Sequence, residues 1–131
     1  MGVSLQYLAA VTRRVLVVDD DLETCEMMAQ LLEFEGFEAR MATNGRDALD
    51  QLASGFRPDV IVLDLMMPVM DGRQFLQCRH ADSEYAAIPV VVLSAASDRL
   101  SSVTADAVLR KPINVAELVD KLRQYTPRFP R

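Results

Sequence analysis

The sequence has few of the residues that would mark a secreted, disulfide-bonded or membrane-spanning protein. It contains two cysteines, one histidine and no tryptophan in 131 residues, so it predicts neither a disulfide framework nor a zinc site. We expect Cys25 and Cys78 to be small buried residues in a reducing compartment. No apolar run approaches the roughly 20 residues of a membrane-spanning helix, and the N-terminus lacks the basic and apolar regions of a secretory signal. These absences predict a cytoplasmic protein.

Basic residues are also outnumbered. Nineteen acidic side chains against fourteen Lys and Arg give a formal net charge of −5, which argues against direct binding to nucleic acid. Half of the residues are hydrophobic, enough for the core of a single domain of this length. We expect that domain to span 14–125, after a leader (1–13) that is helical or flexible and before a flexible tail (126–131).

Short runs of Val, Ile and Leu alternate with longer segments of helical periodicity. Such alternation predicts an α/β fold, a doubly wound parallel sheet with helices on both faces. The expected strands cover 15–19, 37–42, 60–64, 88–93 and 107–110. The expected helices cover 21–35, the segment between Asn44 and Gly55, 73–81, a short polar stretch at 96–104, and the segment after Asn114.

Acidic side chains stand where two of these strands end. Asp19 and Asp20 close the first strand, and Asp64 closes the third. Ligands of such sheets bind outside the carboxyl ends of the strands. If the two strands are neighbours, about 4.8 Å apart, the three carboxylates repel one another and raise each other's pKa. A hard divalent cation with oxygen ligands relieves this repulsion, so the pattern predicts an Mg²⁺ site.

Four segments at successive strand ends resemble the receiver domain of two-component response regulators. The resemblance covers about Arg14 to Tyr125, and it implies the five-stranded flavodoxin-like (βα)5 fold with strand order 2-1-3-4-5. The segments that carry it are Val17-Val18-Asp19-Asp20-Asp21, Asp64-Leu65-Met66-Met67-Pro68-Val69-Met70-Asp71-Gly72, Val91-Val92-Leu93-Ser94-Ala95 and Leu109-Arg110-Lys111-Pro112.

The resemblance implies a metal site and a phosphoacceptor. Asp64 would accept a phosphoryl group from a phosphohistidine, forming an acyl phosphate. Asp20 and Asp64 would coordinate Mg²⁺ directly, Asp19 would act mainly through bound water, and the backbone carbonyl of Met66 would supply another oxygen. The ion would neutralise charge in a loose transition state.

Two further residues follow from the same resemblance. Lys111 would place a compact positive charge against a phosphoryl oxygen, and Ser94 would donate its hydroxyl to another. The Lys111-Pro112 bond resembles the family's cis peptide. The implied partners are a histidine kinase or a histidine phosphotransfer protein and a downstream protein, with no membrane and no nucleic acid. Such a chain is a signalling phosphoacceptor in a phosphorelay. It is not a turnover enzyme, because it catalyses only its own phosphotransfer and autodephosphorylation.

The sequence departs from this family in two places. The stretch from Ser94 to Lys111 is about five residues shorter than usual, a loss of nearly one and a half helical turns, so the fourth helix should be shortened or irregular. Val108 stands where the family has an aromatic side chain that rotates inward on activation, and a small β-branched residue cannot do so. We expect phosphorylation to be read through another surface, or through the loop after Ser94.

Two other interpretations are weighed against the phosphoacceptor. Aspartate-nucleophile phosphohydrolases carry an Asp-x-Asp pattern, in which the second acid serves as the acid/base. In this sequence Met66 stands at the second position, two residues after Asp64, and it cannot protonate a leaving alcohol. A receiver fold that signals without phosphate, as an interaction module, is the stronger alternative. The complete set of Asp19, Asp20, Asp64, Ser94 and Lys111 argues against it, because a scaffold does not need carboxylates that repel one another. The shortened fourth helix and Val108 argue for it.

Overall fold

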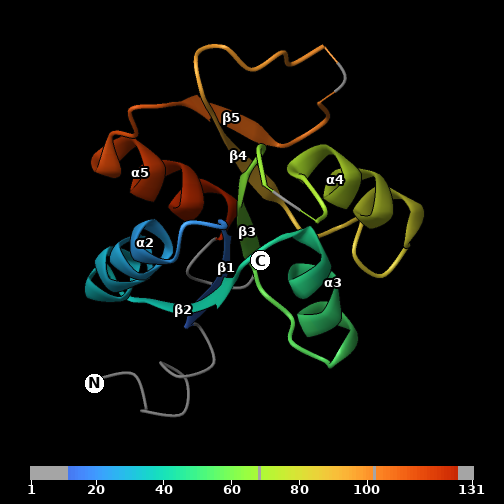
Figure 1. The fold of residues 1–131 in the computed structure, drawn as a ribbon. Helices are drawn as coiled ribbons and strands as arrows, with labels where there is room; N and C mark the ends of the chain where they lie inside the picture. The colour runs from blue at the N-terminus through green and yellow to red at the C-terminus, as the bar shows by residue number, and fades with distance from the viewer. Residues whose placement is uncertain (1–11, 68, 102, 127–131) are drawn as a thin grey trace.

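The chain folds around one parallel sheet that is covered by helices on both faces (Figure 1). The computed structural model describes residues 12–67, 69–101 and 103–126. The leader (1–13) and the tail (126–131) expected from the sequence fall almost wholly outside these residues. None of the helices in the described part of the chain is long and apolar enough to cross a membrane.

The sheet has five strands in the order β2-β1-β3-β4-β5, as expected. All of its neighbouring strands pair in parallel. The buried central strands are almost continuous runs of Val, Leu and Ile, as in sheets covered on both faces. The strands are β1 (Arg13–Val18), β2 (Phe37–Ala42), β3 (Val60–Asp64), β4 (Val90–Ser94) and β5 (Ala107–Arg110).

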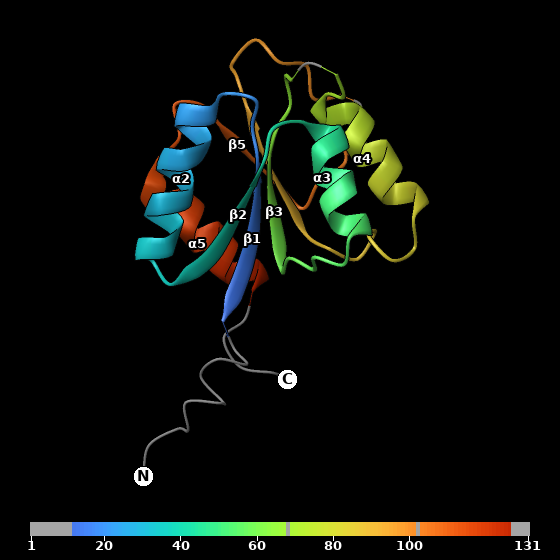
Figure 2. The same cartoon turned by 60° about the horizontal axis from the view of Figure 1, so that its bottom comes forward.

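Helices α2 and α5 cover one face of the sheet, and α3 and α4 cover the other (Figure 2). Alternate residues of a strand point to opposite faces, so Val15 and Val17 pack in the core under α2 and α5. Leu16 and Val18 pack in the core under α3 and α4. The helices are α2 (Leu22–Phe34), α3 (Gly45–Ala53), α4 (Gly72–Ala81) and α5 (Val115–Tyr125).

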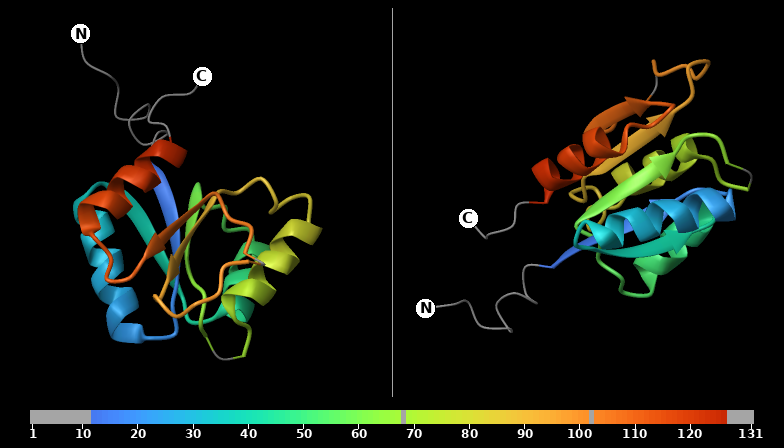
Figure 3. Two further views of the ribbon diagram at one scale, coloured as in Figure 1. Left: turned by 90° about the horizontal axis from the view of Figure 1, so that it is seen from above. Right: turned by 90° about the vertical axis from the view of Figure 1, so that its left-hand side faces the viewer.

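The described residues of 96–104 do not form the short helix expected there. The described residues between Ser94 and Ala107, which omit Ser102, hold turns and irregular backbone, and the segment crosses from β4 to β5 without a coiled ribbon (Figure 3). Leu100, Val103 and Ala105 are the residues that pack against the core. These apolar side chains are too few to form an apolar stripe along a helix, so burial against the core does not stabilise a helix here.

The two cysteines differ in environment. Cys25 is buried under α2 as expected, but Cys78 is exposed, so the prediction for Cys78 was wrong. Helix α4 turns Phe75, Leu76 and Arg79 inward instead. The guanidinium of Arg79 is buried and donates two hydrogen bonds to the carbonyl of Ile88, at 3.1 and 2.6 Å. A long polar side chain therefore occupies an inward position that the apolar pattern of the sequence does not indicate.

The first and last described segments meet beside the amino end of β1. Arg13 Nε donates a hydrogen bond of 2.7 Å to the carbonyl oxygen of Thr126, which follows α5. Asp64 closes β3 at the opposite, carboxyl end of the parallel sheet. The described ends of the chain and the acidic strand ends are therefore on opposite sides of the domain.

Candidate functional site

The three aspartates predicted to share a site do so. Asp19 and Asp20 directly follow β1, and Asp64 is the last residue of β3, the neighbouring strand. Each contributes a carboxylate oxygen to a group whose members all lie within 4.8 Å of one another. The parallel register brings them together, because Val18 pairs with Leu63 and both strands therefore end at the same level. Two adjacent strand ends thus form one acidic cluster.

Burial sets the electrostatics of this cluster. Asp19 and Asp64 are each 6% exposed, whereas Asp20 lies at the surface. Loss of hydration raises the pKa of Asp19, and the charge of Asp64 adds to this, although a hydrogen bond of 2.9 Å from the backbone N–H of Asp21 opposes it. Burial likewise raises the pKa of Asp64, against the effect of its basic partner.

That partner is Lys111, which lies in the loop after β5. Its Nζ is 3.0 Å from Asp64 Oδ1, and its backbone N–H donates to the carbonyl of Ser94 at 2.8 Å. Burial would lower the pKa of Lys111, but the hydrogen bond and charge of Asp64 outweigh burial and raise it. The following bond, Lys111-Pro112, is cis, as the resemblance implied. The ammonium group is therefore charged and directed at the phosphoacceptor candidate.

Ser94 closes β4, the strand next to β3 on its other side. The side chain is fully buried, and its Oγ has no hydrogen-bond partner among the residues that the structure describes. An unpaired buried hydroxyl is costly, about 1–3 kcal/mol, and native structures rarely leave one without a reason. A hydroxyl donor thus closes the strand next to β3 and has no partner among the described residues.

The donor set suits a hard divalent cation. Carboxylate oxygens are the ligands that Mg²⁺ prefers, and opposite ligands of this ion are about 4.2 Å apart, twice its bond length. A group that spans 4.8 Å can therefore hold it if one carboxylate acts through water, the role that the resemblance gives to Asp19. A hydrogen bond from the backbone N–H of Met66 to the Asp64 carboxylate opposes the rise in the pKa of Asp64, but burial outweighs it. The Met66 side chain itself is 60% exposed.

Two glycines shape the loop after Asp64: Gly72, which closes one of the segments that carry the resemblance, and Gly45, which the sequence interpretation did not single out. Gly72 N donates to the carbonyl of Leu65 at 2.8 Å, and a Cβ on Gly72 would lie 2.7 Å from Leu65 Cα. Gly45 N donates to the carbonyl of Met70 at 3.0 Å, and a Cβ there would lie 2.8 Å from Met70 Cγ. Their signal was the Asp-Gly and Asn-Gly pairs of the sequence.

Asp71 caps helix α4. Its side chain accepts a hydrogen bond from the backbone N–H of Gln74 at 2.9 Å, and the Gln74 side chain accepts from the N–H of Asp71 at 3.0 Å. This reciprocal pair is a capping box. It fixes the point at which the chain leaves the loop and enters α4.

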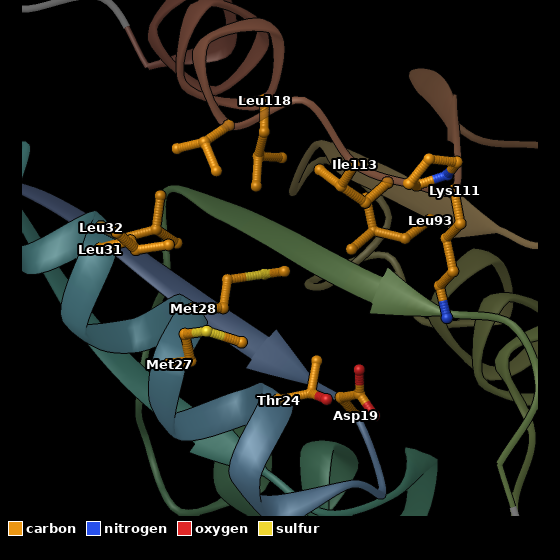
Figure 4. A pocket seen from close by; sticks show the side chains of 12 residues that line it. Asp19, Thr24, Met27, Met28, Leu31, Leu32, Leu93, Lys111, Ile113 and Leu118 are labelled. Carbon is orange, nitrogen blue, oxygen red and sulfur yellow. The ribbon is translucent and has the colours of Figure 1, made fainter.

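A cavity of about 390 Å³ between α2 and α5 opens beside the acidic cluster. Asp19 and Lys111 line one end, and Met28 and Leu118 line the apolar interior (Figure 4). The sequence interpretation overlooked this feature. Its signal was a second apolar stripe on helix 22–34, outside the buried one, at Met27, Leu31 and Phe34. These three side chains are 58%, 40% and 88% exposed.

His80 is not part of the site. It lies on α4, where its Nε2 is 3.2 Å from the carbonyl oxygen of Thr104 and its Nδ1 is 3.0 Å from Arg79 Nη1. Both ring nitrogens are therefore engaged in contacts that hold the segment before β5 against α4.

The sequence matches the family described as "Response regulator receiver domain" over residues 15–123. It is 41% identical over 115 residues to the response regulator MprA of Mycolicibacterium vanbaalenii, covering 84% of this chain and 48% of that protein. The MprA of Mycobacterium avium is 40% identical, with 84% and 49% covered. The chain thus spans about half the length of these relatives.

Solved structures agree with the sequence match. The signal receiver domain of a signal transduction histidine kinase from Syntrophus aciditrophicus superposes with a TM-score of 0.82 at 28% identity, covering 92% of this chain and 94% of that one. The chemotaxis response regulator CheY4 of Vibrio cholerae superposes with a TM-score of 0.76 at 32% identity, covering 87% and 98%. The chain therefore belongs to the receiver domain family of response regulators.

Proposed function

We propose that the chain is a phosphorylatable switch, in which Asp64 accepts a phosphoryl group from a partner's phosphohistidine. One observation carries this proposal. The buried carboxylate of Asp64 shares a cluster with Asp19 and Asp20 while one of its oxygens contacts Lys111 Nζ at 3.0 Å. A buried acid held between an anionic cluster and a cation is a site for a metal ion and a second anion.

The chemistry follows from these groups. A carboxylate oxygen of Asp64 attacks phosphorus, so an O–P bond forms while the P–N bond to the histidine breaks and the nitrogen keeps the electron pair. Lys111 stabilises charge on one phosphoryl oxygen. Ser94, whose hydroxyl has no partner among the described residues, donates to another. The chain acts only on itself, through phosphotransfer and autodephosphorylation, and is not a turnover enzyme.

Mg²⁺ is the proposed metal. When bound, it supplies charge neutralisation and orientation of the phosphoryl group. Asp20 and Asp64 would bind it directly, Asp19 would act through water, and the carbonyl of Met66 would complete the protein ligands. The raised pKa values of Asp19 and Asp64 support this assignment, because buried carboxylates that repel each other are stabilised by a cation between them.

The phosphodonor would dock beside the site, over α2. Met27 and Leu31 are exposed on that helix, and both line the cavity that reaches Asp19 and Lys111. Val115 of α5, 42% exposed, borders the same cavity. Exposed apolar side chains gathered at one place mark protein-interaction surfaces, and this one lies next to the atom that would be phosphorylated. A histidine kinase or histidine phosphotransfer protein is the partner that carries phosphohistidine.

The rest of the proposal concerns the setting. A cytoplasmic location fits a partner with phosphohistidine, and the output is a change in binding to a downstream protein. The expected absence of nucleic-acid binding applies to these 131 residues alone, since the relatives are about twice as long.

Intact-mass spectrometry after incubation with acetyl phosphate and Mg²⁺ tests the proposal. We expect one phosphoryl adduct, which Asp64→Asn and removal of Mg²⁺ abolish. Asp59→Asn is the matched control, because Asp59 lies just before β3, at the other end of that strand, where it accepts a hydrogen bond from Arg14 N at 2.8 Å. Circular dichroism establishes that each variant is folded.

The negative result is equally informative. A folded wild-type chain that takes no adduct with saturating Mg²⁺ would refute the phosphoacceptor function. It would instead support a receiver fold that acts as a phosphate-independent interaction module.

A further inference from the structure

The chain after Ser94 forms a small closed turn. Asp98 N donates to the carbonyl of Ala95 at 3.0 Å, and Ala95 N donates to the side chain of Asp98 at 2.7 Å. The turn therefore has a defined shape although no helix follows it. It begins at the residue next to Ser94, so its position and that of the Ser94 hydroxyl are linked.

An arginine on the neighbouring strand holds this turn. Arg110 is the last residue of β5 and pairs in register with Ser94. Its Nη1 donates to the carbonyl of Ala95 at 2.8 Å and lies 3.4 Å from that of Asp98. The second contact is long, so the bond to Ala95 dominates.

The same strand end carries the site lysine. Lys111 follows Arg110, and its N–H donates to the carbonyl of Ser94 at 2.8 Å. Two consecutive residues where β4 ends, Ser94 and Ala95, are thus bonded through their carbonyls to two consecutive residues where β5 ends. A shift of the Ser94 backbone toward Asp64 would therefore strain or break the bond between the Ala95 carbonyl and Arg110.

The arrangement seen is one in which the Ser94 hydroxyl has no partner among the described residues. In this arrangement the Arg110 guanidinium is bonded to the Ala95 carbonyl. A contact that is stronger in one of two states favours that state by the difference. In this region the bond acts directly between β5 and the turn, because the described residues between the two strands form no helix.

We propose that Arg110 is a positioning residue that holds the turn after Ser94 in its unphosphorylated arrangement and so restrains phosphorylation of Asp64. This inference rests on the proposed phosphoacceptor function and adds a residue that regulates the same site. The hydrogen bonds of the Arg110 side chain go to the carbonyls of Ala95 and Asp98, and none goes to the acidic cluster among the described residues. It acts through the Ala95 carbonyl on the position of Ser94.

Arg110→Met tests the proposal, since methionine keeps an unbranched apolar side chain and removes the donors. Arg99→Met is the matched control. Arg99 lies in the connection between β4 and β5, next to Asp98 of the turn, and the substitution removes the same charge. Its side chain makes no hydrogen bond with the described residues, although its backbone carbonyl accepts one from Arg73. The two measurements are the rate of phosphorylation by acetyl phosphate with Mg²⁺ and the hydrogen exchange of peptides covering residues 94–101.

We expect Arg110→Met to be phosphorylated about threefold faster than wild type, the effect of one hydrogen bond at the weak, exposed end of the usual range. Peptides that contain the Ala95 and Asp98 amides should exchange faster in the unphosphorylated variant, because the turn opens more readily. Arg99→Met should match wild type in both measurements.

Three results would overturn the proposal. An unchanged rate in Arg110→Met, with a normal adduct, refutes the restraint while leaving the phosphoacceptor function intact. An equal rise in Arg99→Met assigns the effect to net charge rather than to the bond. Unchanged hydrogen exchange in Arg110→Met shows that Arg110 does not hold the turn. This measurement needs no phosphate, so it tests the contact between Arg110 and the turn even if no chain is phosphorylated.

Discussion

A single methyl group added at Gly72 should disturb both the fold and the site. Gly72 is the first residue of α4 and packs directly against the strand end that carries the phosphoacceptor candidate. A Cβ there would lie 2.7 Å from Leu65 Cα and 2.8 Å from the backbone oxygen of Asp64. Both atoms belong to the backbone, so no side-chain rotation relieves the overlap.

The size of the effect follows from these contacts. Inserting one carbon into a closely packed region costs about 1–3 kcal/mol. Replacing glycine recovers about 0.4–1 kcal/mol by restricting the unfolded chain. We therefore expect Gly72→Ala to lower the free energy of unfolding by about 1–2 kcal/mol. The loop must also move away by several tenths of an ångström, and since misplacement by 1 Å can cost about 100-fold, phosphorylation should slow about tenfold.

Urea denaturation and the acetyl phosphate assay measure the two effects. Gly36→Ala is the control, because Gly36 has a φ of 96° and a Cβ at this position would meet no heavy atom within 4 Å. Alanine there is strained by about 1 kcal/mol, yet it lies at the end of α2, remote from β3, and should leave phosphorylation unchanged. The reasoning fails if Gly72→Ala unfolds at the wild-type urea concentration and is labelled at the wild-type rate.

Three further predictions concern acidity, strain and thiol reactivity. Burial raises the pKa of Asp19 and Asp64 above the ordinary value of 3.8. Between pH 3.8 and the raised values, the folded chain therefore keeps protons that the unfolded chain has released. The free energy of unfolding without metal should therefore fall as pH rises from 3.8 through the raised values. Urea titrations at several pH values measure this, and a rise over that interval would contradict it. Val69 has a φ of 70° and is 80% exposed, so Val69→Asn should stabilise the fold by about 1 kcal/mol, since asparagine tolerates this backbone and valine does not. A lower urea midpoint would refute that. Burial raises the pKa of Cys25 to about 11, so iodoacetamide at about pH 8 should modify only the exposed Cys78 in the folded chain, and two adducts on folded protein would contradict this.

The regular elements were predictable because burial on both faces leaves a direct trace in sequence. Runs such as Val60-Ile61-Val62-Leu63 carry no polar residue, and Asp64 ends the strand where expected. The acidic cluster was predictable for the same reason. Neighbouring parallel strands end at the same level, so the acidic residues at the ends of the first and third strands lie close together. Asp19, Asp20 and Asp64 are close for this reason alone.

The segment between β4 and β5 was harder because its structure depends on tertiary bonds rather than on periodicity. Arg110 donates to the carbonyl of Ala95, and Arg73 donates to that of Arg99; neither bond has a signature in local sequence. The same holds for Arg79, which is buried because it satisfies the carbonyl of Ile88. In this part of the domain, hydrogen bonds from arginine side chains to backbone carbonyls hold the chain in place, and packing of a helix against the sheet does not.

The bond between Arg13 and Thr126 has a practical consequence for protein engineering. It places the entry to β1 and the exit from α5 side by side, at the end of the sheet away from Asp64. Domains whose ends are adjacent tolerate insertion and circular permutation. The segment from 12 to 126 can therefore be spliced into a surface loop of a host protein through two short linkers, leaving its acidic cluster facing outward. Under the proposed phosphoacceptor function, the host would then carry a phosphodonor-responsive module without fusion at either of its own termini.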